Sequence, residues 1–128
     1  MPNSVVLIPA RSGSKGIINK NLKKINGYSL VALSIIFAKK LNFVSKIFVS
    51  TDSEDIKIEA KKFGSEIFHR PKYLSGDRVS DIEIINHFLH SNKEFINKFE
   101  YLIYLQPTSP FRKLFEIKKA MEMLNKKS

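Results

Sequence analysis

The sequence predicts an α/β fold whose β-sheet is mainly parallel. Short, continuous apolar runs recur along the chain, as is typical of strands that are buried on both faces. Segments in which apolar residues have helical spacing separate these runs. Strands that alternate with helices indicate a parallel sheet with right-handed crossovers.

The first predicted strand and the first predicted helix flank a loop that contains glycines. Residues 5–8 (VVLI) form a continuous apolar run, and Pro9 bounds it. Residues 30–41 carry apolar side chains at helical spacing, which predicts a helix with a broad buried face. Ser29 lies directly before this helix and is a good N-cap.

A second strand and helix follow at once. Residues 46–52 (KIFVSTD) predict another buried strand. A helix is expected over residues 53–63, because Ser53 can cap it and acidic residues favour its first turn. Gly64 is placed to end this helix.

The second half of the chain predicts two further strands and two helices. Residues 66–68 form a short third strand, and residues 70–77 form a loop rich in turn residues. A helix begins at about residue 80, a fourth strand covers residues 101–107, and a last helix covers residues 114–124.

Length and composition limit the class of protein. A chain of 128 residues fits one domain, residues 1–128, and 43% hydrophobic residues with ten Phe exclude a disordered chain. The absence of Cys excludes a disulfide framework or a thiolate metal site and suits a reducing compartment. No run approaches the roughly 18 apolar residues of a membrane span. We expect a soluble, cytoplasmic protein with no membrane partner.

The net charge of +10 is unevenly distributed. The first 50 residues carry eight basic residues and no acidic residue. Such a positive segment attracts polyanions, which include nucleic acid, membrane surfaces and nucleotide phosphates. The Lys-rich and Asn-rich composition of an AT-rich genome explains the excess equally well, so the charge alone leaves the partner open.

Polar loops follow each predicted strand. In open α/β sheets, ligands bind beyond the carboxyl ends of the strands. Here these ends read PARSGSKG, STDS, HRP and QPTSP. The chemistry is therefore expected in these four loops.

The first loop combines glycines with cations and contains no acidic residue. Backbone N–H groups around Gly13 and Gly16 can approach phosphate oxygens, and Arg11, Lys15 and Lys20 can neutralise them. The loop is neither a Walker A motif nor GxGxxG. A plain connection between strand and helix is the alternative, and the three cations favour phosphate binding over it.

Four blocks of sequence together are more specific than any one motif. They are IPARSGSKGIINKN, VSTDSEDI, RPKYLSGD and LQPTSPFR, in this order. They resemble the signature of the acylneuraminate (sialic acid) cytidylyltransferases, also called CMP-sialic acid synthetases, and the resemblance covers essentially the whole chain. It implies a three-layer, Rossmann-like nucleotidyltransferase fold, of which this chain is the N-terminal, nucleotide-binding part.

The resemblance also implies a reaction and its substrates. CTP and a nine-carbon α-keto (nonulosonic) sugar acid give the CMP-sugar and pyrophosphate with Mg²⁺, for the synthesis of surface glycans such as lipopolysaccharide or capsule. Arg11 and Lys20 would bind the triphosphate and act in catalysis, and Ser14 and Lys15 would help to shape the turn. Asn21 would contact the sugar of the nucleotide.

Two later blocks imply further contacts. Arg70 would hold the cytidine portion, and its alternative is an arginine on a surface loop. Ser80 or Asp81 would meet the base. For Asp77, a structural role in fixing its loop and a catalytic role explain the residue equally well. Asp52 lies at the end of a predicted strand and is a weak candidate for a side chain that faces the site.

The last block implies the sugar contacts. Gln106, Thr108 and Ser109 would meet the sugar acid, since an amide and hydroxyls suit a polyhydroxylated substrate. The alternative is a turn made of turn residues. His87 and His90 lie three apart on a predicted helix, but no metal-binding motif accompanies them.

The resemblance is incomplete at the C-terminal side. Family members are longer and carry Asp-x-Asp carboxylates for Mg²⁺, which this sequence lacks. We therefore expect the metal ligands, much of the sugar pocket and a homodimerisation segment in a C-terminal part that is absent here. The chain is then a fragment, or a truncated product.

Several alternatives stay open. The sugar acid can be sialic, pseudaminic, legionaminic or 3-deoxy-manno-octulosonic acid. A catalytically incomplete module would bind CTP without releasing pyrophosphate. A basic nucleic-acid-binding domain would bind DNA or RNA in a salt-dependent way, and the four ordered blocks argue against it, so no nucleic-acid partner is expected.

Overall fold

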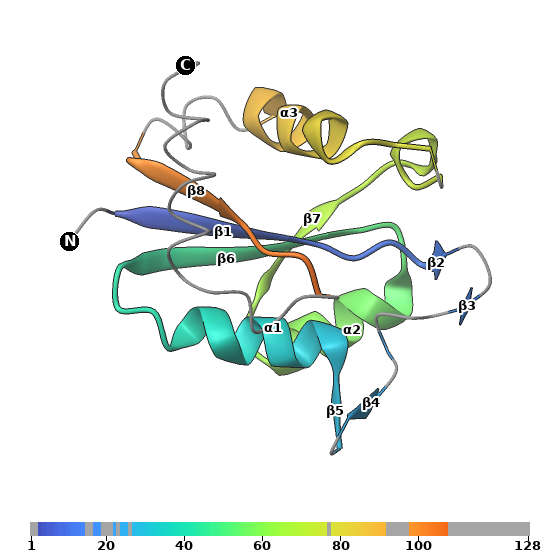
Figure 1. Ribbon diagram of the computed structural model, residues 1–128, viewed down its shortest axis with the longest axis horizontal. Helices are drawn as coiled ribbons and strands as arrows, with labels where there is room; N and C mark the ends of the chain where they lie inside the picture. Colours follow the sequence, from blue (N-terminus) through green and yellow to red (C-terminus); the bar gives the residue numbers. More distant parts are fainter. Residues whose placement is uncertain are drawn as a thin grey trace.

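The structure is a computed structural model that describes residues 3–14, 17–18, 22, 24–25, 27–76, 78–91 and 98–107. Its centre is a four-stranded sheet in the order β7-β6-β1-β8 (Figure 1). All three neighbouring pairs of strands are parallel, as predicted. The strands are β1 (Ser4–Pro9), β6 (Val44–Thr51), β7 (Glu66–His69) and β8 (Tyr101–Tyr104).

Helices cover both faces of this sheet, which gives three layers (Figure 1). Helices α1 (Leu30–Lys39) and α2 (Glu54–Lys62) pack on one face, and α3 (Asp81–Ser91) packs on the other. Strand β1 serves both cores, because successive side chains of a strand point to opposite faces. Val6 and Ile8 join the core under α1 and α2, while Val5 and Leu7 join the core under α3. All four are fully buried, which explains the continuous apolar run.

The predicted N-caps of α1 and α2 are confirmed in atomic detail, whereas the helix expected over residues 30–41 ends at Lys39. The Ser29 side chain accepts a hydrogen bond from the backbone N–H of Ala32 at 3.0 Å, so it caps α1. Ser53 caps α2 in the same way through the N–H of Ile56 at 3.3 Å. Gly64 follows α2 with φ of +89°, a conformation that glycine adopts at little cost.

Some predicted boundaries were wrong by a few residues. The strand expected at 46–52 begins earlier, at Val44, and stops at Thr51. The strand expected at 101–107 stops at Tyr104, and the three residues after it form no strand. The predicted helix at 114–124 lies outside the described residues.

Several short elements were not predicted. Two-residue strands β2 (Gly13–Ser14) and β3 (Ile17–Ile18) pair antiparallel, and so do β4 (Lys24–Ile25) and β5 (Tyr28–Ser29). A short 3₁₀ helix, η2 (Lys72–Leu74), follows β7. Within the described ranges, no helix has the length and apolar character needed to cross a membrane.

Candidate functional site

The carboxyl ends of the four strands lie at one edge of the sheet, as the parallel order requires. Hydrogen bonds continue past the strands and hold the following loops together. The Ala10 N–H donates to the carbonyl of Ser50 at 2.9 Å, and the Arg70 N–H donates to the carbonyl of Thr51, also at 2.9 Å. The loops after β1, β6 and β7 are therefore joined side by side, and we call this edge the candidate site.

The loop after β1 is fixed to the end of β6 by one residue pair. The backbone N–H of Ser12 donates to Asp52 Oδ1 at 2.8 Å, and the Ser12 hydroxyl donates to Oδ2 at 2.7 Å. Partial burial raises the pKa of Asp52, but the hydrogen bonds from Ser12 outweigh it and lower the pKa below its ordinary value. Arg11 is half-buried immediately before Ser12.

Arg70 lies deep in the structure rather than on its surface. The side chain is only 2% exposed, so the alternative of a surface-loop arginine is wrong. Its Nε donates to Ser50 Oγ at 3.1 Å, Nη2 to the Ser50 carbonyl at 3.2 Å, and Nη1 to the Leu74 carbonyl at 3.4 Å. Arg70 thus connects β6 to η2.

Several charged or polar groups act on Arg70. Burial lowers its pKa, whereas Tyr104, Asp52 and Asp81 act in the opposite direction. Arg11 repels it. The candidate site therefore contains two guanidinium groups close enough to influence each other, a combination that suits an anionic ligand.

A second group of side chains lies between α3 and the end of β8. The Tyr104 hydroxyl donates to Asp81 Oδ1 at 2.8 Å, and Gln106 Nε2 donates to Asp81 Oδ2 at 2.9 Å. Burial, and then the hydrogen bond to Asp81, raise the pKa of Tyr104. The structure thus brings a predicted nucleotide residue, Asp81, into contact with a predicted sugar residue, Gln106.

Ser80 has a structural partner. The Glu83 N–H donates to Ser80 Oγ at 3.2 Å, and Ser80 Oγ donates to Glu83 Oε1 at 3.2 Å. Ser80 therefore occupies the capping position before α3. The exposed Asp81 beside it is the first residue of this helix.

The remaining predicted site residues are described in part or not at all. For Ser14 the structure describes the backbone, which pairs with Ile17 in β2 and β3. The others lie outside the described residues: Lys15, Lys20, Asn21, Asp77, Thr108 and Ser109.

The two histidines of α3 have different surroundings. His87 is half-buried with its ring centroid 4.9 Å from that of Phe68, and burial, followed by the charge of Arg70, lowers its pKa. His90 is exposed. In the described part of the chain, no group of three or more His, Cys, Asp or Glu side chains is arranged to hold a metal ion.

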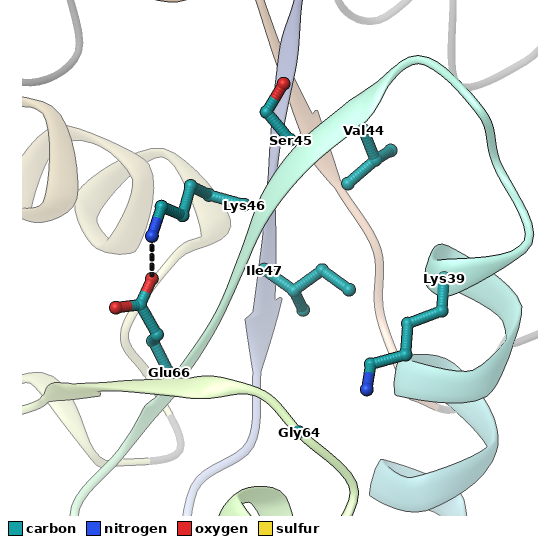
Figure 2. Close-up of a pocket in the computed structure, with 7 residues that line it drawn as sticks. All are labelled: Lys39, Val44, Ser45, Lys46, Ile47, Gly64 and Glu66. Carbon is teal, nitrogen blue, oxygen red and sulfur yellow. Dashed lines mark ion pairs between the residues drawn. The ribbon is translucent and has the colours of Figure 1, made fainter.

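A cavity of about 480 Å³ lies at the opposite end of the sheet (Figure 2). It is next to the amino end of β6, where Lys46 forms an ion pair of 3.4 Å with Glu66, and Lys39 extends toward Gly64. No predicted site residue that the structure describes lines it. Among the described residues, Arg11, Arg70 and Gln106 lie at the other edge instead.

Three residues of the site were missed in the sequence. Ser12 directly follows Arg11, and Ser50 lies in β6 two residues before Asp52, and these positions were the available signal. Tyr104 was read only as part of a strand. Its hydroxyl reaches Asp81 because both lie at the same edge, which strand pairing alone does not predict.

A parallel sheet between helices, with polar loops at its carboxyl edge, defines an α/β protein of the class that binds ligands at this edge. Residues 5–128 match the model of the cytidylyltransferase family. The chain therefore belongs to the cytidylyltransferases, a family of nucleotidyltransferases, as the four sequence blocks predicted.

Named relatives agree with this assignment. The N-acylneuraminate cytidylyltransferase of Escherichia coli O18:K1:H7 is 37% identical over 119 residues, which are 93% of this chain and 27% of that protein. The CMP-N,N'-diacetyllegionaminic acid synthase of Campylobacter jejuni is 40% identical over 112 residues, which are 86% of this chain and 48% of that protein. The chain thus spans about half of these relatives, or less.

A solved structure agrees with the fold. The CMP:2-keto-3-deoxy-manno-octonic acid synthetase complexed with CTP matches with a TM-score of 0.75 at 20% identity. The match covers 97% of this chain and 48% of that chain. At this level of identity, the likeness bears on the fold alone, which is the predicted α/β architecture.

Proposed function

We propose that this chain is the nucleotide-binding part of a cytidylyltransferase that transfers CMP from CTP to a nonulosonic sugar acid. One observation carries the proposal. Arg11 and Arg70, predicted to bind the nucleotide, lie at the same edge of the sheet as Gln106, predicted to bind the sugar acid, and Asp81 contacts Gln106 there. Relatives of this chain are named for CMP-sugar synthesis.

In the proposed reaction the protein forms no covalent bond to the substrates, and its main contribution is positive charge around the phosphates. A sugar hydroxyl attacks the α-phosphorus of CTP, a new P–O bond forms, and the bond to pyrophosphate breaks as the hydroxyl loses its proton. Negative charge gathers on the leaving pyrophosphate, so cations placed around it favour the transfer. Arg11 and Lys20 are proposed for this role, with the N–H groups of the glycine loop.

Arg70 is proposed to act on the cytidine side through the loop that it holds. Its three donors are directed at Ser50 and Leu74, so it fixes η2 beside the site. Its buried positive charge also favours an anionic ligand nearby. Asp81 then offers a polar contact for the base at the start of α3.

The identity of the sugar acid is proposed at the level of its class. One relative is named for N-acylneuraminate and another for N,N'-diacetyllegionaminic acid, both nonulosonic acids. The solved structure with the same fold is named for a related but shorter keto acid. Nonulosonic acids, including pseudaminic acid, are therefore the first candidates, and the product would serve the synthesis of surface glycans.

Mg²⁺ belongs to the proposed reaction, but the described residues do not form a site for it. Mg²⁺ is usually bound by one or two carboxylates together with substrate phosphates. Here Asp52 already accepts two hydrogen bonds from Ser12, and Asp81 accepts one each from Tyr104 and Gln106. No metal-binding group of three acidic or histidine side chains occurs among the described residues.

A second candidate is a module that binds CTP without completing the reaction. The chain matches about half the length of its relatives, or less. This partial match is the observation that supports an incomplete module.

The proposal has two further parts. The first is that the protein forms a homodimer, which sedimentation of the purified protein with and without CTP tests. The second is that it acts in the cytoplasm, where CTP is available.

The proposal is tested by pyrophosphate release from CTP and Mg²⁺ with each sugar acid offered separately. A protein that joins this chain to the remaining length of its relatives should release pyrophosphate with a nonulosonic acid, and its Arg11→Ala variant should release it at least tenfold more slowly. Lys40→Ala is the matched control, because it removes one exposed cation at the end of α1. CTP binding without pyrophosphate release would support the incomplete module instead.

A further inference from the structure

We infer that Asp52 is a positioning residue, which holds the glycine loop through Ser12 so that the loop receives the phosphates of the nucleotide. The inference rests on the proposed binding of CTP at this edge. Asp52 was only a weak candidate for facing the site, and Ser12 was not a candidate at all.

The geometry of the pair is that of a two-point clamp. Each carboxylate oxygen of Asp52 accepts one hydrogen bond from Ser12, at 2.8 Å from the backbone N–H and at 2.7 Å from the hydroxyl. Two bonds between the same two residues fix orientation as well as distance. Ser12 stands between Arg11 and β2, so the clamp determines where the loop leaves the sheet.

Asp52 is itself held from both sides. The preceding residue, Thr51, ends β6, and its carbonyl accepts the N–H of Arg70 at 2.9 Å. The following residue, Ser53, caps α2 and donates its own N–H to Thr51 Oγ1 at 3.1 Å. The carboxylate is therefore attached to a rigid strand end and helix start, which makes it a firm anchor for a loop.

The clamp extends the pairing of β1 with β6. The last pair of this ladder joins Pro9 to Ser50, and the Ala10 N–H still bonds to the Ser50 carbonyl at 2.9 Å. Beyond Ala10, the contact of Ser12 with Asp52 takes over from backbone pairing.

Metal binding is a poor alternative for Asp52. Both of its oxygens are occupied by Ser12, and none of the described side chains joins it in a metal-binding group of three. A free carboxylate beside a phosphate would repel it, whereas this one is neutralised in part by two donors and by the nearby charge of Arg70. Positioning is the role that fits these contacts.

If Asp52 positions the loop for phosphate binding, its loss should affect ligands with phosphates and spare ligands without them. A general loss of stability would affect both kinds of ligand alike. Loss of the clamp should weaken binding of the triphosphate part of CTP, while cytidine, which lacks phosphates, should bind as before. Asp52→Ala, which removes both hydrogen bonds, should raise the dissociation constant for CTP about tenfold, and Ser12→Ala, which keeps the bond from the backbone N–H, should raise it by less. The affinity for cytidine, measured by NMR titration, should stay within about twofold.

Two further variants sharpen the test. Ser12→Thr keeps both donors and should keep CTP affinity within about twofold of the unaltered chain. The double variant Ser12→Ala, Asp52→Ala should bind CTP no more weakly than Asp52→Ala alone, because Asp52→Ala already removes both hydrogen bonds of the pair. The inference is overturned if Asp52→Ala binds CTP normally, or if CTP and cytidine lose affinity together.

Inorganic triphosphate separates this inference from the proposed function. If the chain binds triphosphate in a manner that depends on Asp52 but does not distinguish CTP from other nucleotides, the proposed function fails and the clamp stands. If CTP binds and the Asp52 variants make no difference, the clamp fails and the proposed function stands. If neither CTP nor triphosphate binds, both fail.

Discussion

Gln106 donates its side-chain amide to Asp81 across 2.9 Å, which joins the end of β8 to the start of α3. Because an aspartate carboxylate at neutral pH only accepts hydrogen bonds, the NH₂ group of Gln106 must face Asp81. The amide oxygen then remains for a ligand, and no described residue donates to it. Gln106 is thereby prepared to accept a hydrogen bond from a hydroxyl or amide N–H of the sugar acid.

Exchanging the amide of Gln106 and the carboxylate of Asp81 tests which of the two residues must donate the hydrogen bond. Gln106→Glu should weaken binding of N-acetylneuraminate at least about tenfold, because two carboxylates then face each other. The double variant Asp81→Asn, Gln106→Glu should recover most of the affinity, since the donor and acceptor are only exchanged. Binding is measured by calorimetry with CTP present. No recovery in the double variant would show that Gln106 acts in another way.

The clamp of Ser12 on Asp52 gives stability that depends on pH. Partial burial raises the pKa of Asp52, but the hydrogen bonds from Ser12 lower it overall below the ordinary value of 3.8. A lowered pKa means that the ionised form is favoured in the folded state, so this contribution is complete well above pH 3.8 and is lost as the pH falls through the folded-state pKa.

Urea unfolding of the unaltered chain and of Asp52→Asn between about pH 3 and pH 7 measures this effect. The difference in the free energy of unfolding should be constant near neutral pH and should shrink at the acid end. A difference that grows as the pH falls contradicts the sign of the shift. Glu100→Gln serves as a control carboxylate, because its side chain is exposed.

Burial of Arg70 makes it a structural residue as well as a charge. Arg70→Met should lower the free energy of unfolding by about 3 kcal/mol, because three hydrogen bonds of roughly 1 kcal/mol each are lost. Arg78→Met removes an exposed arginine eight residues further on and should cost less than about 0.5 kcal/mol. Urea unfolding compares the two. Equal effects would mean that the contacts of Arg70 with Ser50 and Leu74 contribute little.

Ser80 offers a test between a helix cap and a contact to the base. As the cap of α3, Ser80→Ala should lower the stability by about 1 kcal/mol and leave CTP affinity unchanged. Ser80→Asp should keep the stability, since aspartate also caps helices. Thermal unfolding and CTP titration are measured on both variants. A large loss of CTP affinity in Ser80→Ala, with stability preserved, would restore the predicted contact to the base.

Local structure could be predicted from the sequence where a residue type has one clear physical role at its position. Ser29 and Ser53 were predicted as caps and are caps, because a hydroxyl before a helix satisfies a free N–H. The apolar run of β1 was predicted as buried on both faces and is. The β4–β5 hairpin was missed although Asn26-Gly27 between Ile25 and Tyr28 is a strong turn signal.

The candidate site was predictable in position but less so in its contacts. The rule that ligands bind at the carboxyl ends of parallel strands located the loops. The clamp joins Ser12 to Asp52 across 40 positions of sequence, and no local pattern encodes such a pair. The burial of Arg70 was also hidden, because its partners are backbone carbonyls and a serine rather than an acidic residue that could have been paired with it.

The most direct test of the central claim is titration of the isotope-labelled chain with CTP, followed by NMR. Saturable binding should shift the backbone signals of Ser12, Asp52, Arg70 and Gln106, while those around the cavity at Gly64 stay unchanged. GTP should bind at least about tenfold more weakly. Absence of binding, equal affinity for both nucleotides, or shifts centred on Gly64 would contradict a CTP site at the carboxyl edge of the sheet.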